Sequence, residues 1–324
     1  MEYRSYSDLN RLIRKNVSRF QTSKYDLIVG IPRSGMLPAY MISLILNKKC
    51  CDIDSLINNI ALKTGSTRNS KDEIIYPSDA KKILIIDDSI CSGKSLSNEI
   101  SKIPFNIREK ITTLAVYTSE KVRDDVDITL EYVPTPRIFE WNIFHHSIVG
   151  NSCFDIDGVL CIDPTEEEND DGEKYNNFLL NALPYIIPTG KINSLVTSRL
   201  EKYRPETEVW LKNNGVVYEN LLMLDLPTKE ERQRLGAHAS FKAEVYKKSG
   251  QELFYESDRN QAIKIHELTK KPVYCVDSNE FFNKNSIISS FYNASLKKSY
   301  ITRIVKRLPK PFYNSIKYFY HLIR

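Results

Sequence analysis

Short apolar runs that alternate with amphipathic segments constrain the fold of this chain more than any other feature of its sequence. Most runs are uninterrupted and β-rich, which is typical of parallel strands buried on both faces of a sheet. They fall at 26–31, 82–88, 111–117 and 128–133, and then at 151–157, 192–198, 221–226, 252–257 and 272–277. Helical patterns lie between them, for example at 35–47, 94–103, 205–214 and 258–270. The alternation predicts two consecutive α/β domains with mainly parallel sheets.

Length and composition agree with this prediction. The 324 residues are enough for two domains, and 41% hydrophobic with 27% charged residues is a globular composition. No run approaches the roughly 20 apolar residues that a membrane span requires, and the N-terminus lacks the apolar core of a secretory signal. The cysteines are scattered without metal-ligand spacing, so we expect reduced thiols and a cytoplasmic protein.

The C-terminal segment carries most of the excess positive charge. The net charge is +5, but residues 297–324 hold eight Lys or Arg and no acid, so the rest of the chain is mildly acidic. Aromatic and aliphatic residues interleave with these cations. The segment predicts either peripheral attachment to an anionic membrane surface, at about 1 kcal/mol per cation, or a helix pair packed on the second domain. Nucleic acid is not an expected partner, because the body has no basic stripe.

The predicted domains are 1–147 and 148–285, followed by a basic, amphipathic helical tail at 286–324. The break is placed near 146–152, where the chain is briefly polar and contains a glycine. The oligomeric state is left open, and a homo-oligomer is allowed.

In the first domain, the apolar run 82–88 ends in Asp87 and Asp88, and a turn of small residues leads into a helix. Such a turn presents backbone N–H groups to an anion, and the helix dipole adds to their attraction. The acids before the turn can accept hydrogen bonds from sugar hydroxyls. The sequence therefore predicts a sugar-phosphate site whose turn consists of Cys91, Ser92, Gly93, Lys94 and Ser95.

This arrangement resembles the motif with which type I phosphoribosyltransferases bind 5-phosphoribosyl 1-diphosphate (PRPP). The resemblance implies that Asp87 and Asp88 hold the ribose hydroxyls and that the turn at 91–95 holds the 5-phosphate. It also implies a pyrophosphate loop at 31–35, where Arg33 meets the leaving diphosphate. The residues of that loop assigned to PRPP binding are Arg33, Ser34 and Gly35.

Two further segments of the first domain fit the same resemblance. The stretch 63–79 corresponds to the family's flexible loop, which closes over the reacting centre and excludes water. Its cations are Lys63, Arg68 and Lys71, for which an ordinary solvated loop is an equal alternative. The segment 136–144 corresponds to the hood over the acceptor, with Trp141 either as an acceptor platform or as hood core.

One position departs from the purine-salvage members of this family. Those members have an acid where this chain has Cys91, and that acid handles a proton of the base. We therefore do not expect a purine acceptor. The sequence does not identify the group that deprotonates the acceptor.

In the second domain, the apolar run 151–157 ends with Asp155 and Asp157, followed by Gly158. Carboxylates two residues apart at a strand end face the same side. One can attack phosphorus, while the other protonates the leaving oxygen and later activates water. Gly158 permits the sharp turn that follows. The pattern predicts a phosphate-ester hydrolase.

This segment resembles the first motif of the haloacid-dehalogenase-like (HAD-like) phosphohydrolases. The resemblance implies that Thr197 holds the transferring phosphoryl group and that Lys242 neutralises the phosphate and the nucleophile. It also implies a Mg²⁺ site built from carboxylate oxygens. Its predicted ligands are Asp155, Asp157, Glu256 and Asp258. Arg199 is expected to be an exposed residue at a helix start, with substrate contact as the alternative.

The two resemblances imply two Rossmann-like domains, a type I phosphoribosyltransferase fold followed by a HAD-like fold with a small cap. They also predict consecutive reactions. A 5-phosphoribosyl group is transferred from PRPP to a glycan, which we expect to be lipid-linked, and the 5-phosphate is then hydrolysed. The product is a β-ribofuranosyl group, as in bacterial proteins that supply ribofuranose to capsule and O-antigen polysaccharides.

Two alternatives remain open at this point. One is a pyrimidine-type phosphoribosyltransferase fused to a nucleotidase, with the base bound near Trp141. The other is a protein that binds PRPP only as a regulatory signal, which predicts no turnover.

Overall fold

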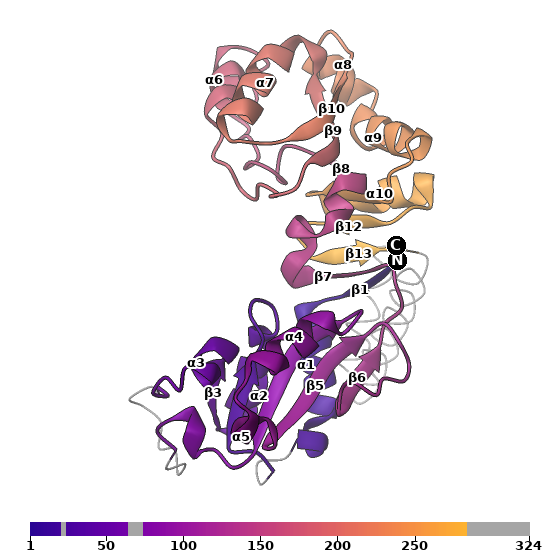
Figure 1. Cartoon of the computed structure of the whole chain (residues 1–324). Coiled ribbons are helices and arrows are strands. Elements are labelled where there is room, and N and C mark those ends of the chain that lie inside the picture. The colour runs from indigo at the N-terminus through magenta and orange to yellow at the C-terminus, as the bar shows by residue number, and fades with distance from the viewer. Residues whose placement is uncertain (21–23, 64–73, 284–324) are drawn as a thin grey trace, which may run out of the picture. The chain divides into compact units, whose positions relative to one another are not determined.

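The computed structural model describes residues 1–20, 24–63 and 74–283. The chain divides into two compact units, Met1–His146 and Ser147–Arg324 (Figure 1). Each unit is built around one mainly parallel sheet, so the α/β fold class expected from the alternating apolar runs is confirmed. The predicted tail at 286–324, including 297–324, lies outside the described residues.

The sheet of the first unit has five strands, all parallel to their neighbours, in the order β3-β2-β4-β5-β6. Side chains alternate between its faces because successive residues of a strand point in opposite directions. Leu27 and Val29 therefore join one core, while Ile28 joins the other. The strands are β2 (Leu27–Gly30), β3 (Lys49–Asp52), β4 (Ile83–Ile90), β5 (Ile111–Thr118) and β6 (Ile128–Tyr132).

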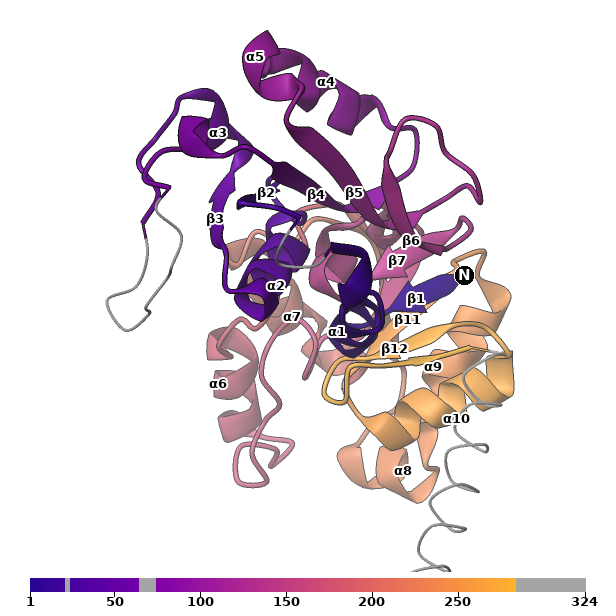
Figure 2. The same cartoon turned by 90° about the horizontal axis from the view of Figure 1, so that it is seen from below.

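Helices cover both faces of this sheet (Figure 2). The first core contains residues of α1 (Tyr6–Lys15) and α2 (Met36–Leu46). The second contains residues of α3 (Ile53–Ile57), α4 (Lys94–Lys102) and α5 (Phe105–Arg108). Burial of both faces explains why the strands read as uninterrupted apolar runs.

A small parallel ribbon lies outside the main sheet of the first unit. It pairs β1 (Glu2–Arg4) with β7 (Arg137–Phe139), in the register Glu2 to Arg137 and Arg4 to Phe139. The ribbon therefore joins the start of the chain to the segment that was predicted as the acceptor hood.

The sheet of the second unit has six strands in the order β10-β9-β8-β11-β12-β13. All neighbours are parallel except the last pair, in which β13 runs antiparallel to β12. The strands are β8 (Ser152–Phe154), β9 (Ile192–Leu200), β10 (Tyr218–Leu224), β11 (Leu253–Glu256), β12 (Val273–Cys275) and β13 (Glu280–Phe282).

One face of the second sheet packs against α9 (Ala237–Lys248) and α10 (Arg259–Thr269), as their shared core shows. Two other helices, α6 (Glu173–Asn181) and α7 (Arg204–Asn213), contact each other. The buried Trp210 of α7 donates from Nε1 to the carbonyl of Ala182 at 2.7 Å. The short α8 (Lys229–Arg234) connects β10 to α9.

Each sheet contains one point where the chain reverses its direction of travel across the sheet. In the first unit the chain moves from β2 outward to β3 and returns to β4 on the other side of β2. In the second it moves from β8 through β9 to β10 and returns to β11 on the other side of β8. Open parallel sheets bind ligands beyond the carboxyl ends of strands at such points. Ligand sites are therefore expected at the carboxyl ends of β2 and β4 and at those of β8 and β11.

Within the described residues, no helix has the length and apolar character needed to cross a bilayer.

Candidate active sites

The turn after β2 lies tightly against β4. The Ile31 N–H donates to the Ile86 carbonyl at 3.0 Å. A Cβ at Gly35 would lie 2.6 Å from the Ile31 oxygen and 2.8 Å from the Ile86 oxygen, so only glycine fits. The predicted pyrophosphate loop is therefore a compact turn, with Arg33 exposed and Ser34 half-buried before α2 begins.

The second turn of the first unit follows β4, which continues through Ile90. Asp87 and Asp88 thus lie inside the strand and not at its end as the sequence indicated, and both are buried. Gly93 has a φ of +75°, which favours glycine, and precedes α4. Of the residues predicted to bind phosphate there, the exposed ones are Cys91, Ser92, Lys94 and Ser95.

Two arginines that sequence reasoning missed donate to backbone carbonyls at the end of β4 and in the turn that follows it. Arg123 donates from Nη1 to the Cys91 oxygen at 2.5 Å and pairs with Asp125 through two contacts of 2.8 and 2.7 Å. The buried Arg137 donates from Nη2 to the Ile90 oxygen at 2.7 Å. No sequence pattern marks either residue, because each acts through a contact that is distant along the chain.

The adjacent carboxylates of Asp87 and Asp88 repel each other when both are ionised. Burial, and then the charge of Asp88, raises the pKa of Asp87 to about 7. Trp141 donates from Nε1 to Asp88 Oδ2 at 2.8 Å and stacks on Phe139 with ring centroids 4.9 Å apart. The indole therefore orients Asp88 from within an aromatic cluster, a role not foreseen from sequence.

The predicted flexible loop is described only in part. Lys63 is exposed, whereas Arg68 and Lys71 lie outside the described residues.

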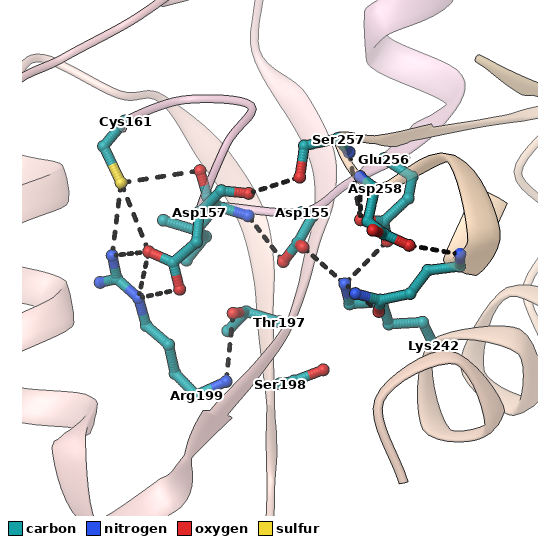
Figure 3. A network of polar contacts seen from close by, with 12 residues as sticks. Asp155, Asp157, Cys161, Thr197, Ser198, Arg199, Lys242, Glu256, Ser257 and Asp258 are labelled. Carbon is teal, nitrogen blue, oxygen red and sulfur yellow. Dashed lines mark hydrogen bonds and ion pairs between the residues drawn. The ribbon is translucent and has the colours of Figure 1, made fainter. Parts of the chain in front are cut away.

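The second candidate site begins at Asp155, directly after β8. Figure 3 shows the polar contacts of this site. The Asp155 N–H donates to the Tyr255 carbonyl at 3.0 Å, which extends the pairing of β8 with β11 by one residue. Gly158 has a φ of +72°, and a Cβ there would lie 2.3 Å from Ser257 Oγ. Glycine is therefore required for the chain to turn back immediately after Asp157.

Lys242 of α9 lies between two buried acids. Its Nζ is 2.5 Å from Asp155 Oδ2, 2.7 Å from Glu256 Oε2 and 3.2 Å from Gln261 Oε1. Burial alone would lower the pKa of Lys242, but the charges of Asp155 and Glu256 outweigh it and raise that pKa. Burial raises the pKa of Asp155, and raises that of Glu256 to about 7, while Lys242 opposes both changes.

Arg199 corrects the sequence prediction. It lies in β9, and its side chain is 0% exposed, so it is not an exposed arginine at a helix start. Its Nη2 is 2.6 Å from Asp157 Oδ1, and its Nε is 3.2 Å from Asp157 Oδ2 (Figure 3). Its backbone N–H donates to Thr197 Oγ1 at 3.2 Å. Arg199 thus orients Asp157 and links it to Thr197.

These side chains surround a cavity of about 380 Å³. Of the predicted residues, those that line it are Asp155, Asp157, Thr197, Lys242 and Asp258. Glu256 is not among them, because its oxygens accept from Lys242 and from the N–H groups of Ser257 and Asp258.

The cavity has a surplus of acids. Asp163 and Asp277, which sequence reasoning missed, also line it, and burial with the neighbouring carboxylates raises the pKa of Asp163 to about 6. Hard carboxylate oxygens suit Mg²⁺, so the donor chemistry fits the predicted ion. No three His, Cys, Asp or Glu side chains in the described parts of the chain already converge as a metal-binding group.

Ser198, Arg232 and His238 also line this cavity and were not predicted. Burial, and then the charges of Arg232 and Lys242, lowers the pKa of His238 to about 4, so its imidazole is neutral at pH 7. Single residues on α8 and α9 carry no motif that would have identified them.

The chain matches no protein-family model, and a search of curated protein sequences finds no match. Solved structures show similarity over part of the chain. A purine phosphoribosyltransferase from Pyrococcus horikoshii has 19% identity and a TM-score of 0.31, covering 43% of this chain and 92% of that one. A Helicobacter pylori xanthine-guanine-hypoxanthine phosphoribosyltransferase has 18% identity and a TM-score of 0.31, covering 44% and 93%. An Aeropyrum pernix orotate phosphoribosyltransferase has 18% identity and a TM-score of 0.27, covering 40% and 71%.

Proposed function

We propose that the protein is a bifunctional enzyme that transfers 5-phosphoribosyl from PRPP to a glycan and then hydrolyses the 5-phosphate. The observation that carries the proposal is the placement of both motif sets at the reversal points of the two sheets. One point has an acid pair beside an exposed turn of small residues. The other has an aspartate held by a lysine at a cavity rich in carboxylates. The first suits an activated ribose phosphate, and the second suits attack on a phosphate ester.

In the first step, Asp87 and Asp88 accept hydrogen bonds from the ribose hydroxyls. A diol replaces the water that these buried acids have lost, which offsets the burial that, ahead of the charge of Asp88, raises the pKa of Asp87. The turn at 91–95 holds the 5-phosphate, and Arg33 meets the diphosphate that leaves. Inversion at the α-configured anomeric carbon gives a β-linkage.

In the second step, Asp155 attacks phosphorus, and the bond to the ribose oxygen breaks. Asp157 supplies a proton to that oxygen and then takes one from the water that hydrolyses the aspartyl phosphate. Lys242, through its 2.5 Å contact, favours the ionised form of Asp155 and opposes the rise in its pKa that burial causes. Of the four predicted Mg²⁺ ligands, Asp157 pairs with Arg199 and Glu256 with Lys242. Asp155 and Asp258 would therefore hold the ion, which would offset the charge of the phosphoryl group.

The pairing of the two reactions favours a glycan acceptor over nucleotide synthesis. Nucleotides keep their 5-phosphate, whereas a ribofuranosyl glycan does not. Lipid-linked glycans lie at the cytoplasmic membrane face, where the basic segment 297–324 would bind anionic lipid. We therefore propose a cytoplasmic protein, peripheral on the membrane, that acts in bacterial surface polysaccharide synthesis.

The proposal is tested by the mass of the product formed from PRPP and a lipid-linked oligosaccharide. The wild-type protein should add an unphosphorylated ribosyl group, and Asp155→Asn should accumulate a glycan that keeps the 5-phosphate. Asp87→Ala combined with Asp88→Ala should stop transfer while p-nitrophenyl phosphate is still hydrolysed. A nucleoside formed from PRPP and a pyrimidine, with no ribosylated glycan, would contradict the glycan acceptor.

A further inference from the structure

Arg232 is a buried cation at the cavity of the second unit. It lies in α8 and is 7% exposed, and it lines the cavity together with Asp155 and Thr197. Its Nη1 donates to the carbonyl of Ser198 at 2.8 Å, but its Nε is buried without a hydrogen-bond partner. In the part of the chain that the structure describes, no carboxylate forms an ion pair with it.

The other cations of the cavity are already neutralised. Lys242 contacts Asp155 and Glu256, and Arg199 pairs with Asp157. A guanidinium stays charged in proteins, and a buried charge without a counter-ion is destabilising. Among these three cations, Arg232 is therefore the one with charge left for an anion that enters the cavity.

Ser198 gives a second, independent indication. Its Oγ is also buried without a hydrogen-bond partner, and the residue lines the same cavity. The Arg232 contact to the Ser198 carbonyl keeps the two residues adjacent. Two residues that line one cavity thus each have a buried donor without a partner, and one of the two is charged. Oxyanions bind to such donors.

We propose that Arg232 and Ser198 form an oxyanion-binding wall that takes the non-bridging oxygens of a dianionic phosphate monoester. This inference rests on the proposed phosphatase reaction and names the recognition element of that site. A phosphate is favoured over a carboxylate because Ser198 directly follows Thr197, the residue proposed to hold the phosphoryl group, and both line the cavity with Asp155. A dianion also needs a cation beyond Lys242, whose charge two acids share.

The test uses the full chain and inorganic phosphate as the probe, with binding followed by calorimetry. Arg232→Met should bind phosphate roughly 10- to 100-fold more weakly, as expected for the loss of a charge-assisted hydrogen bond. Arg234→Met is the matched control, because Arg234 lies in the same helix but is 70% exposed and pairs with Glu231. Phosphate bound by the first unit cancels in the difference between the two variants.

Thermal unfolding separates this role from a structural one. An uncompensated buried cation destabilises the fold, so without phosphate Arg232→Met should unfold at the same temperature as Arg234→Met or above it. Phosphate should raise the unfolding temperature of Arg234→Met more than that of Arg232→Met. Ser198→Ala should weaken phosphate binding about fivefold.

Equal phosphate affinity in Arg232→Met and Arg234→Met would overturn the inference, and so would a large loss of stability in Arg232→Met without phosphate. Failure of the proposed function has a different signature. In that case, phosphate binding would still depend on Arg232, but Asp155→Asn would form no phosphorylated ribosyl product.

Discussion

Removal of Lys242 tests whether the buried charges of the second unit act as one group. Lys242 is 2% exposed, and the two acids that it contacts have side chains that are 7% and 0% exposed. Lys242→Met leaves both acids without a counter-ion, and removal of one partner from a buried ion pair typically costs about 3–5 kcal/mol. We therefore expect the free energy of unfolding of this unit to fall by about that amount.

The loss should depend on pH in a defined direction. The pKa of Glu256 is about 7 in the folded chain against an ordinary 4.5, so the folded state holds a proton that the unfolded state releases. This group therefore contributes stability at low pH, and the contribution is lost as the pH rises from about 4.5 through about 7. Without Lys242 the acids must ionise unaided, so the effect of Lys242→Met should be larger at pH 8 than at pH 5.

The assay is urea unfolding followed by tryptophan fluorescence. Each unit has one tryptophan, Trp141 in the first and Trp210 in the second, so a Trp141→Phe background leaves Trp210 to report on the second unit alone. Lys248→Met is the control, because Lys248 lies in the same helix and makes only an exposed, solvent-screened pair with Glu244. Adding Glu256→Gln to Lys242→Met should recover part of the loss. Equal effects of Lys242→Met and Lys248→Met would refute the reasoning.

Three further predictions concern other parts of the chain. Asp87→Asn should stabilise the first unit at pH 8 by up to about 4 kcal/mol, because folding raises the pKa of Asp87 from 3.8 to about 7. The gain in stability should shrink as the pH falls towards 4. Urea unfolding followed by Trp141 fluorescence in a Trp210→Phe background measures it. Arg199→Lys replaces a two-pronged contact to Asp157 with a point charge, so kcat for p-nitrophenyl phosphate should fall roughly tenfold or more with little change in KM. Deletion of 297–324 should move the protein from membrane to soluble fractions, and an unchanged distribution would favour helices packed on the second unit.

The alternating apolar runs predicted most of the sheet strands and the helices that follow them, because parallel strands buried on both faces leave an unmistakable pattern. For example, the apolar run 111–117 corresponds to β5, and the helical pattern 94–103 corresponds to α4. The short strands β1, β3, β7 and β13 were not predicted, because none of them lies in an uninterrupted apolar run of its own. Their pairing depends on partners that are distant in the sequence.

The candidate site of the second unit was predictable only for residues that belong to a motif. Asp155, Thr197 and Lys242 were found in this way, and the structure places all three at one cavity. Arg199 was misjudged because sequence alone does not show that β9 continues past Thr197 and buries the guanidinium. Arg232 was missed for a related reason. Its importance depends on being a buried cation with no carboxylate partner among the described residues, which the sequence does not show.

The central claim is that the two sites act in turn on the same ribose. A single-turnover experiment with PRPP labelled with ³²P in its 5-phosphate and a lipid-linked oligosaccharide tests this most directly. The account predicts that the label appears first in the glycan and leaves it later as inorganic phosphate, and that in Asp155→Asn it stays in the glycan. Release of labelled phosphate without any passage through the glycan would contradict the claim.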